Sequence, residues 1–477
     1  MRTRVDPEVA GLYRQQLKDT ISCYIDYPEE VVFSLPPAEL DDIRLQWLRR
    51  KFDAAVGGIA IVGQMAQQHG IDSVGCFDDA LPIFYNQETF QSYPQSWLEN
   101  SDFKRMTKWL GKLCAVDLAA VDASSCESIE DWIAVLQQQS SVDLMISAGG
   151  NGKAAFLPRT CEEWMTAQRA TLWGIQMAMQ AVDGDAAPLQ SGVDRVPLIY
   201  PGARAGARSW RFLDFYEDTF GNGLVDAPLG YTDADLLTLA GRIREASRKG
   251  EAGSLQINPA LLARKDEIAR LNAEKPLQIE ALMQRMLDDY RDQRIIFYSS
   301  MQMLYDLAMR FEQQGIKGAY AADSFFFCGG GFVSGTAPDD WKARAAAALG
   351  IPESAIRIGY GMQESLTGMQ MCDHGNYHIP VCMIPYVLDE TTDQPLPRSG
   401  RQQGRFAFFD LLADTSWGGY ITSDRVTINW DQPCGCGHQG AYLDAAISRV
   451  AELQDDKIGC AGTAGALDDA ADFLLRA

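Results

Sequence analysis

The spacing of apolar residues changes near residue 140. Before this point, long segments such as 40–54 and 102–118 repeat apolar residues with the period of a helix and are separated by polar turns. Long periodic segments are the most dependable sign of a helix in a single sequence. We therefore predict a helical lead-in over residues 1–140.

From residue 142 onward, short apolar runs alternate with helical segments. The runs are DLMIS, VPLIYP, FFFCG, AIRIGYG and RFAFFDLL, and helical periodicity occupies 162–182 and 276–313. Strands separated by helices are typical of βαβ units. This pattern predicts an α/β core over 141–403, with a charged helical excursion at 231–275.

After Gly404 the pattern shortens into strands and turns. We expect a small β-rich subdomain at 404–450, followed by a short C-terminal remnant at 451–477 that contains one helix at 466–475. No internal repeat is visible. A chain of 477 residues is long enough to bury a large core and to divide into more than one domain.

Composition and charge narrow the range of partners. The chain is 47% hydrophobic and 22% charged, as in an average globular protein, which argues against disorder or a fibrous repeat. Its 64 acidic residues exceed its 42 basic ones, and a formal charge of -22 repels phosphate backbones and anionic lipid. We expect neither a nucleic-acid nor a membrane partner.

The sequence also predicts a cytoplasmic location. No stretch approaches the run of about 18 apolar residues that a spanning helix needs, and the first residues lack the apolar segment of a signal peptide. In the cytoplasm the 11 cysteines are mostly reduced, so clustered ones indicate metal ligands, reactive thiols or buried small side chains.

The first candidate site is the loop SAGGNGK, directly after the apolar run DLMI. Glycines let backbone N–H groups turn toward an anion, and a lysine after them can meet phosphate charge. The positions concerned are Ser147, Gly149, Gly150, Asn151, Gly152 and Lys153. The alternative is an ordinary Gly-rich turn, because the Walker spacing is not met.

The second candidate is FFFCGGG, an aromatic strand that runs into three glycines. At Gly329 and Gly330 the backbone must approach a neighbour closely or adopt a positive φ. A planar base can lie against such a segment. A tight strand-to-helix turn is the alternative.

The third candidate is RIGYGMQES, in which a strand ends in a turn that carries an aromatic ring, an amide and a carboxylate. The ring, the amide and the carboxylate belong to Tyr360, Gln363 and Glu364, and Gly361 follows the ring as a further candidate position. A carboxylate beside a phosphate loop suits Mg²⁺, which takes oxygen ligands and shares them with substrate phosphates. The alternative is that Glu364 is a solvated residue after a turn.

The fourth candidate consists of Asp424 in TSDRV and Arg449 in ISRV. An acid can accept hydrogen bonds from two ribose hydroxyls, and an arginine can reach a phosphate. Taken singly, each residue would be interpreted as part of a surface ion pair.

In this order, the four motifs resemble those of the adenylate-forming superfamily, and within it the phenylacetate-CoA ligase and acyl-protein synthetase branch, over residues 142–459. SAGGNGK is similar to the phosphate loop of that family and FFFCGGG to its adenine-flanking glycine segment. The resemblance implies that Tyr360 stacks near adenine and that Glu364 binds Mg²⁺. It also implies that Asp424 holds the ribose and that Arg449 lies by the hinge and the ribose.

The resemblance therefore implies a large adenylate-forming N-terminal domain with βαβ subdomains and a small β-rich subdomain. The chain also departs from the family. Ala148, Gly150 and Asn151 stand where Ser or Thr is common, and Gln363 replaces the usual Thr. Since the chain ends soon after Arg449, we expect the full C-terminal lid domain and its catalytic lysine to be absent.

A separate group of cysteines and histidines suggests a metal site. Zn²⁺ favours four sulfur or nitrogen ligands in a tetrahedron, often supplied as two short pairs from separate loops. The candidate ligands are Cys372, His378, Cys434 and Cys436. The spacings are not those of standard fingers, and His374 or His438 could substitute. The phenylacetate-CoA ligase branch shows a similar pattern, so we expect a structural Zn²⁺, with a catalytic Zn²⁺ as the alternative.

These features predict ATP-dependent activation of a carboxylic acid to an acyl-adenylate, with release of pyrophosphate. Glu364, Lys153 and Arg449 are the predicted catalytic residues, and ATP and Mg²⁺ are the predicted cofactors. The acyl group would pass to a thiol or an amine, supplied by CoA, a carrier protein, a partner enzyme or Cys460. The alternative interpretation of Cys460 is a small residue in a Gly-rich turn, because only Lys457 among its neighbours is basic.

Three points stay open at this stage. The stretch YPGARAGARSW at 200–210 could line an acid pocket or form a surface loop. A non-catalytic subunit that binds a partner enzyme through the same fold is the alternative function. A nucleotide-binding oxidoreductase would need a Gly-x-Gly-x-x-Gly after the first strand, and that fingerprint is absent.

Overall fold

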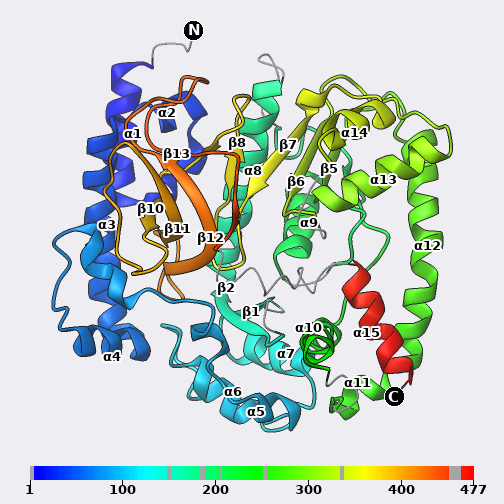
Figure 1. The fold of residues 1–477 in the computed structure, drawn as a ribbon, viewed down its shortest axis with the longest axis horizontal. Coiled ribbons are helices and arrows are strands. Elements are labelled where there is room, and N and C mark those ends of the chain that lie inside the picture. Colours follow the sequence, from blue (N-terminus) through cyan, green and yellow to red (C-terminus); the bar gives the residue numbers. More distant parts are fainter. Residues whose placement is uncertain are drawn as a thin grey trace.

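Figure 1 shows the fold of the chain in a computed structural model. The residues that the structure describes are 5–147, 152–182, 189–204, 207–250, 255–332, 338–450 and 464–476.

The first part of the chain is helical, as predicted. Its elements are α1 (Pro7–Asp19), η1 (Ile21–Asp26), α2 (Glu29–Val32), α3 (Pro37–Gly58), α4 (Ala60–His69), η2 (Phe77–Ile83), η3 (Thr89–Gln91), α5 (Gln95–Glu99), α6 (Phe103–Leu110) and α7 (Ile129–Gln139). Helix α3 contains the predicted segment 40–54. The segment 102–118 is helical only in α6, because the chain turns at Gly111.

Strands and helices then alternate. This part comprises β1 (Val142–Ser147), β2 (Ala155–Thr160), α8 (Cys161–Val182), β3 (Leu198–Ile199), α9 (Ala207–Phe220), β4 (Val225–Asp226), α10 (Ala234–Lys249), α11 (Pro259–Ala263), α12 (Lys265–Asp288), β5 (Ile296–Ser300), α13 (Met301–Gln313), β6 (Phe325–Gly329), α14 (Trp341–Leu349), η5 (Glu353–Ala355) and β7 (Ile356–Tyr360). The remaining elements are β8 (Met369–Met371), β9 (Tyr377–His378), β10 (Met383–Leu388), β11 (Arg401–Asp410), β12 (Gly419–Asn429), β13 (Tyr442–Leu443), β14 (Ser448–Arg449) and α15 (Ala464–Arg476).

Among the described residues, one large sheet of 12 strands dominates the molecule. Strands β4, β3, β5, β6 and β7 are parallel neighbours, as expected for an α/β core. From β7 onward the sheet continues antiparallel through β8, β9, β13, β12, β11 and β10. The antiparallel part therefore begins before residue 404, since β10 already pairs with β11.

Two sequence predictions were wrong. Strand β1 belongs to no βαβ unit but forms a separate antiparallel hairpin with β2, paired from Val142↔Thr160 to Ser147↔Ala155. Both strands are almost fully buried, so their sequences look like those of parallel core strands. The segment 276–313 is not one helix. Strand β5 interrupts it, because the run IIFY is β-branched and aromatic.

The main hydrophobic core joins the two ends of the sequence. It contains Tyr13 and Leu48 from the N-terminal helices, Phe408 from β11 and Leu474 from α15. Figure 1 shows α15, in red, beside α10 and α12, where Lys275 and Asp468 form an ion pair of 2.8 Å. Among the described helices, none combines the length and apolarity needed to cross a membrane.

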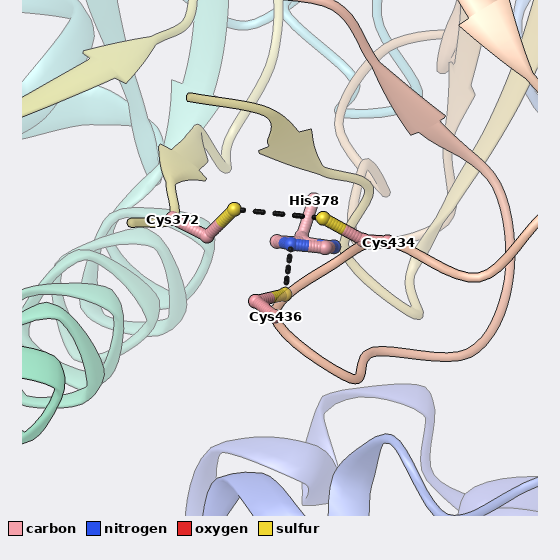
Figure 2. A group of neighbouring side chains, drawn as sticks. All are labelled: Cys372, His378, Cys434 and Cys436. Atoms are coloured by element: carbon pink, nitrogen blue, oxygen red, sulfur yellow. Dashed lines mark hydrogen bonds between the residues drawn. The ribbon is translucent and has the colours of Figure 1, made fainter. Parts of the chain in front are cut away.

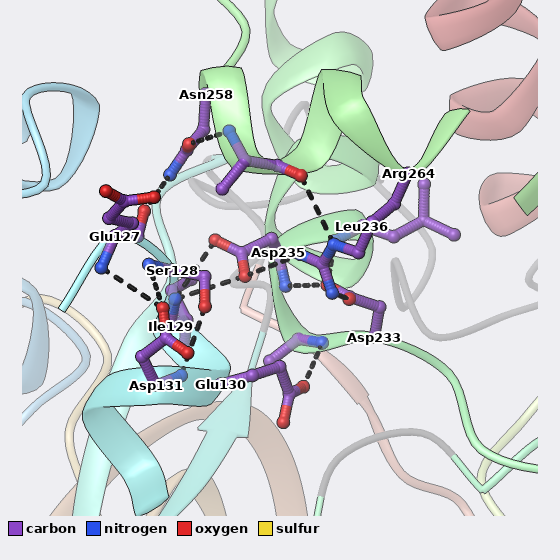
Figure 3. A network of polar contacts seen from close by, with 12 residues as sticks. Glu127, Ser128, Ile129, Glu130, Asp131, Asp233, Asp235, Leu236, Asn258 and Arg264 are labelled. Atoms are coloured by element: carbon purple, nitrogen blue, oxygen red, sulfur yellow. Dashed lines mark hydrogen bonds and ion pairs between the residues drawn. The ribbon is translucent and has the colours of Figure 1, made fainter. Parts of the chain in front are cut away.

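A buried polar network fastens α7 to α10 (Figure 3). The carboxylate of Asp235 accepts the N–H of Ile129 through both oxygens, at 3.2 and 3.1 Å, and its side chain is only 5% exposed. Arg264 pairs with the neighbouring Asp233 and lies 3.5 Å from Asp235. Burial, and next the charge of Asp233, raise the pKa of Asp235 to about 7.

This pKa predicts a pH-dependent stability. Because 3.8 is the ordinary pKa of the group, the folded chain holds a proton between about pH 4 and 7 that the unfolded chain has lost, so the Asp235 contribution falls as the pH rises. Asp235→Asn stays uncharged. As the pH rises from 5 to 8, we expect the unfolding free energy of the parent to fall by up to about 3 kcal/mol relative to that of the variant. Denaturant unfolding at several pH values measures this.

The matched control is Asp266→Asn, which removes an exposed carboxylate from the first turn of α12. It should leave the slope of stability against pH almost unchanged. Parallel curves for the parent and Asp235→Asn would show that Asp235 is ionised in the folded chain at these pH values.

Candidate functional site

Three of the predicted site residues meet at one place on the sheet. Tyr360 ends β7, Asp424 lies in β12, and Arg449 lies in β14, directly opposite Asp424 in the strand register. The Tyr360 hydroxyl donates to Asp424 Oδ2 at 2.7 Å, and Arg449 Nε lies 3.3 Å from Asp424 Oδ1. The Arg449 side chain is 61% exposed, so its guanidinium can also reach a ligand.

Glu364 lies in the turn that follows Tyr360. Its Oε1 accepts a hydrogen bond of 3.2 Å from the hydroxyl of Tyr420, four residues before Asp424 in β12. Burial raises the pKa of Glu364, because a charged carboxylate loses hydration there. A cation bound at this carboxylate would offset that cost, so the position suits a divalent metal ion carried by a phosphate substrate.

Arg159 contacts the same turn from strand β2. The sequence did not identify it as a site residue. It lies in β2, is 1% exposed, and donates from Nη2 to the carbonyl of Glu364 at 2.9 Å. Within the described part of the chain its Nε and Nη1 have no hydrogen-bond partner. In the sequence, Arg159 is the one charged residue of the largely apolar strand AFLPRT. Burial of a charge is costly unless the charge has a partner, so this position indicates a specific contact.

The sequence did not identify Tyr420 either. Its neighbours in the sequence mark it less clearly than the apolar strand marks Arg159. It occupies one position in GGYITSD, where an aromatic residue fits any half-buried strand. Its contact with Glu364 arises only because β12 passes beside the turn after β7.

The hairpin of β1 and β2 holds the two ends of the predicted phosphate loop. Ser147 ends β1, and Gly152 and Lys153 precede β2; Gly149, Gly150 and Asn151 lie outside the described residues. Gly152 has φ +77°, and a Cβ there would lie 2.3 Å from the Cβ of Glu245 in α10. Only glycine fits this close approach.

The ammonium group of Lys153 faces the N-terminal part of the chain. It donates to the carbonyl of Tyr93 and lies 4.4 Å from the centroid of the Tyr93 ring. Burial lowers the pKa of Lys153. Its phosphate contact stays a prediction.

The glycine segment predicted to flank a base lies beside the strand of Tyr360 in the sheet. Gly329 at the end of β6 is paired with Gly359 in β7, and Gly330 adopts φ +69°. A Cβ on Gly359 would lie 2.5 Å from Cζ of Phe327. Gly361 follows Tyr360, and the carbonyl of Gln363 lies 3.5 Å from Nη2 of Arg159.

The four predicted metal ligands also come together (Figure 2). The ligand atoms of Cys372, His378, Cys434 and Cys436 all lie within 4.8 Å of one another. The two sulfurs of Cys372 and Cys434 are 3.7 Å apart, and Cys436 Sγ is 3.2 Å from His378 Nε2. This set of three thiols and an imidazole can hold a metal ion, and tetrahedral Zn²⁺ prefers such donors.

Two tight turns aim these side chains. In one, Gly375 has φ +73° and the N–H of Cys372 donates to the carbonyl of Asn376. In the other, Gly437 has φ +91° and the N–H of Cys434 donates to the carbonyl of His438. The neighbouring Cys436 thiol lowers the pKa of Cys372, which favours a thiolate at that position.

The alternative histidines lie beside the cluster rather than in it. His438 pairs with Glu29, and its ring centroid is 4.0 Å from that of His378. His374 packs against Gly435, where a Cβ would lie 2.6 Å from the His374 Nδ1. The geometry therefore favours His378 as the nitrogen ligand.

Two open points of the sequence analysis can be located. In the stretch 200–210, Arg204 pairs with Asp214 at 2.9 Å, and Trp210 packs edge-on against Tyr231; parts of this stretch lie outside the described residues. Cys460 also lies outside the described residues.

No protein-family model matches this chain, and no match was found among curated proteins. The fold is similar to that of solved adenylate-forming enzymes. One is a 2-hydroxyisobutyryl-CoA ligase in an open conformation with 2-HIB-AMP and CoA (TM-score 0.50, 12% identity, 87% of this chain and 71% of that chain). The same ligase in the postadenylation state with R3-HIB-AMP gives a TM-score of 0.51 at 12% identity, over 88% of this chain and 69% of that chain.

At this identity the likeness concerns the fold alone. The chain has the mixed α/β fold of the large N-terminal domain of adenylate-forming enzymes. A fold of this kind hosts more than one activity, so function depends on the side chains of the site.

Proposed function

We propose that this chain activates a carboxylic acid with ATP to give an acyl-adenylate and pyrophosphate, and that it belongs to the phenylacetate-CoA ligase and acyl-protein synthetase branch. The observation that carries the proposal is the meeting of Tyr360, Asp424 and Arg449 beside the turn of Glu364. An aromatic ring and a half-buried carboxylate at the carboxyl end of the parallel strand β7, beside an acid and a cation from the antiparallel strands β12 and β14, suit a nucleotide.

In the proposed reaction, an oxygen of the substrate carboxylate attacks the α-phosphorus of ATP. A bond to phosphorus forms, the bond from the α-phosphorus to the bridging oxygen breaks, and pyrophosphate leaves. No side-chain nucleophile is needed. Catalysis consists of positioning and of stabilising charge on the phosphate oxygens.

Each of these residues would bind a different part of ATP. Tyr360 stacks near the adenine, and Asp424 accepts hydrogen bonds from the ribose hydroxyls. Arg449 contacts the ribose and the adjacent phosphate. Glu364 would hold Mg²⁺, which supplies charge neutralisation when bound. Lys153 and the backbone of the loop SAGGNGK would contact the phosphates.

The second half-reaction transfers the acyl group to a thiol or an amine. CoA, a carrier protein or a partner enzyme would supply it. The cysteine and histidine cluster would hold a structural Zn²⁺, since its four ligands leave no open position for water.

The direct test is ATP–pyrophosphate exchange with the purified chain and a panel of aryl, fatty and amino acids. Exchange that depends on one class of acid is the expected result. A folded protein without exchange across the panel would favour the alternative, a non-catalytic subunit that uses this fold to bind a partner enzyme.

Asp424→Asn should weaken ATP binding. The change removes the charge and one acceptor while keeping the shape, and a hydrogen bond to a charged group is worth about 1.5–3 kcal/mol. We expect the KM for ATP in the exchange assay to rise by about 10- to 100-fold, with a smaller rise for Tyr360→Phe.

Asp444→Asn is the matched control, because that carboxylate pairs with Arg401 at 2.6 Å elsewhere on the sheet. It should leave the KM for ATP unchanged. Equal effects of Asp424→Asn and Asp444→Asn would mean that Asp424 supports the fold and not the nucleotide.

A further inference from the structure

The guanidinium of Arg159 donates to backbone carbonyls rather than to a carboxylate. Its Nη2 lies 2.9 Å from the carbonyl oxygen of Glu364 and 3.5 Å from that of Gln363. The other two nitrogens have no hydrogen-bond partner within the described part of the chain, although the residue is only 1% exposed. Burying a charge with so few partners is costly, and the contact that accompanies it here is the one with the Glu364 turn.

Asp410, at the end of β11, holds the same turn at a second point. It is fully buried, and its Oδ2 accepts the N–H of Leu366 at 2.7 Å. Its Oδ1 accepts the N–H of Leu412 at 2.9 Å, which fixes the carboxylate itself. The turn is therefore held by a donor at the carbonyl of Glu364 and by an acceptor two residues later. Two such contacts fix the backbone from which the Glu364 side chain extends.

The positive charge of Arg159 also acts on the carboxylate of Glu364. Burial raises the pKa of Glu364, and the charge of Arg159 lowers it. Arg159 thus favours the ionised carboxylate, which is the form that binds Mg²⁺. The other titratable groups around this carboxylate come from three strands and are Tyr420 and Asp424 in β12, Tyr360 in β7 and Arg449 in β14.

Two of these neighbours act in opposite directions on the pKa of Glu364. The hydroxyl of Tyr420 donates a hydrogen bond to the carboxylate and lowers its pKa, whereas the negative charge of Asp424 raises it. The positive charge of Arg159 therefore counteracts both burial and Asp424.

We propose that Arg159 is a positioning residue for the metal-binding acid, and that it fixes the backbone of Glu364 so that the carboxylate faces the Mg²⁺ of ATP. The inference rests on the proposed function, in which Glu364 binds that Mg²⁺. Arg159 is buried and contacts the turn through backbone carbonyls, so it acts through Glu364 and not on ATP.

Two variants of Arg159 and a matched control test this role. Arg159→Met removes the donors and the charge, whereas Arg159→Lys keeps the charge and loses the planar guanidinium. The control is Arg44→Met in α3. Arg44 is also buried, at 6% exposed, and also donates to two backbone carbonyls, those of Val381 at 3.0 Å and Pro380 at 2.9 Å.

The first assay is ATP–pyrophosphate exchange with Mg²⁺ and pH varied. Arg159→Met should need about 10- to 100-fold more Mg²⁺ for half-maximal exchange, the usual effect of removing a group that orients a metal ligand. The acid limb of its pH profile should move up by about 1 pH unit, because loss of the nearby positive charge raises the pKa of Glu364. Arg159→Lys should keep the pH profile of the parent and need less additional Mg²⁺. Arg44→Met should lower the thermal midpoint and change neither property.

A double variant distinguishes action through Glu364 from a general structural role. In the Glu364→Gln background, Arg159→Lys should leave the residual exchange almost unchanged, since its effect depends on the carboxylate that is already lost. Full loss in both backgrounds, or a pH profile and Mg²⁺ requirement that Arg159→Met leaves unchanged, would overturn the inference while adenylation stands. If Arg159→Met does not fold, the Mg²⁺ requirement of Arg159→Lys and this double variant decide.

A binding experiment separates this inference from the proposed function. If no acid supports exchange, adenylation fails, and electron paramagnetic resonance of Mn²⁺ with ATP and the chain tests Arg159 by itself. Weaker Mn²⁺ binding in both Arg159→Lys and Glu364→Gln, with unchanged binding in Arg44→Met, would support the positioning role. Equal binding in all variants, or no binding to the parent, would overturn it.

Discussion

Glu364→Gln is expected to lower ATP–pyrophosphate exchange by about 10²- to 10³-fold, the usual loss when one group that stabilises transition-state charge is removed. The amide keeps the shape and can still accept the Tyr420 hydroxyl, which now lies 3.2 Å from Oε1. It lacks the charge that Mg²⁺ requires. Exchange assays at saturating ATP, with Mg²⁺ varied, measure the loss.

The same change should not weaken the fold. Burial raises the pKa of Glu364, so the folded chain holds a proton on this carboxyl group more tightly than the unfolded chain does, and the contribution of the group to stability declines as the pH rises through that pKa. At neutral pH, Glu364→Gln is therefore expected to leave the thermal midpoint unchanged or slightly higher. For the same reason, exchange by the parent chain should fall when the pH is lowered, because the protonated acid does not bind Mg²⁺.

Tyr420→Phe is the control for geometry, since it keeps the ring and removes only the donor to Glu364. We expect a smaller loss of exchange and a higher requirement for Mg²⁺. Retained exchange together with a large loss of stability in Glu364→Gln would identify Glu364 as a structural acid.

Cys434→Ser is expected to abolish metal binding and to destabilise the chain. The purified parent should contain about one zinc per chain, and the variant almost none, because a serine hydroxyl is a poor replacement for a thiolate ligand. Elemental analysis of both proteins measures this. The expected loss of stability is on the order of several kcal/mol, since structural zinc is bound with about 10–16 kcal/mol in small zinc domains.

The local strand pairing explains why the loops depend on the cluster. Strand β9 pairs with β13 through only two residue pairs, Tyr442↔His378 and Leu443↔Tyr377. So short a ladder gains little from its own hydrogen bonds. A metal ion held by Cys372 and Cys434 would fasten the loop after β8 to the loop after β12.

Cys161→Ser is the matched control, because Cys161 is an exposed thiol at the start of α8. It should retain the metal and the thermal midpoint of the parent. A parent protein that is free of zinc and equally stable with a chelator would remove the metal site from the molecule.

The sequence predicted the local structure of the two stretches that carry most of the candidate site residues. Strands β6 and β7 were predicted from the runs FFFCG and AIRIGYG, and the turn with Glu364 follows β7 as expected. The four metal-ligand candidates were also predicted, although their spacing left His374 and His438 as alternatives. In each case a short sequence motif predicted both a local structure and the chemical groups that it carries.

The hairpin of β1 and β2 shows the limit of such reasoning. A buried antiparallel strand and a buried parallel strand have the same apolar pattern, so periodicity identified β1 as a strand without identifying its partner. The contact of Arg159 with Glu364 is of the same kind, since 205 positions of the chain separate the two residues.

By itself, the sequence determined the type of most elements, the order of the four motifs and the candidate residues for a nucleotide site and a metal site, because these depend on side-chain chemistry and on neighbours along the chain. Only the tertiary structure decided which of them meet. It placed Asp424 opposite Arg449, brought Tyr420 and Arg159 to Glu364, and chose His378 for the cysteine cluster. Strand partners and contacts of this kind result from how distant segments pack, and no local pattern records that packing.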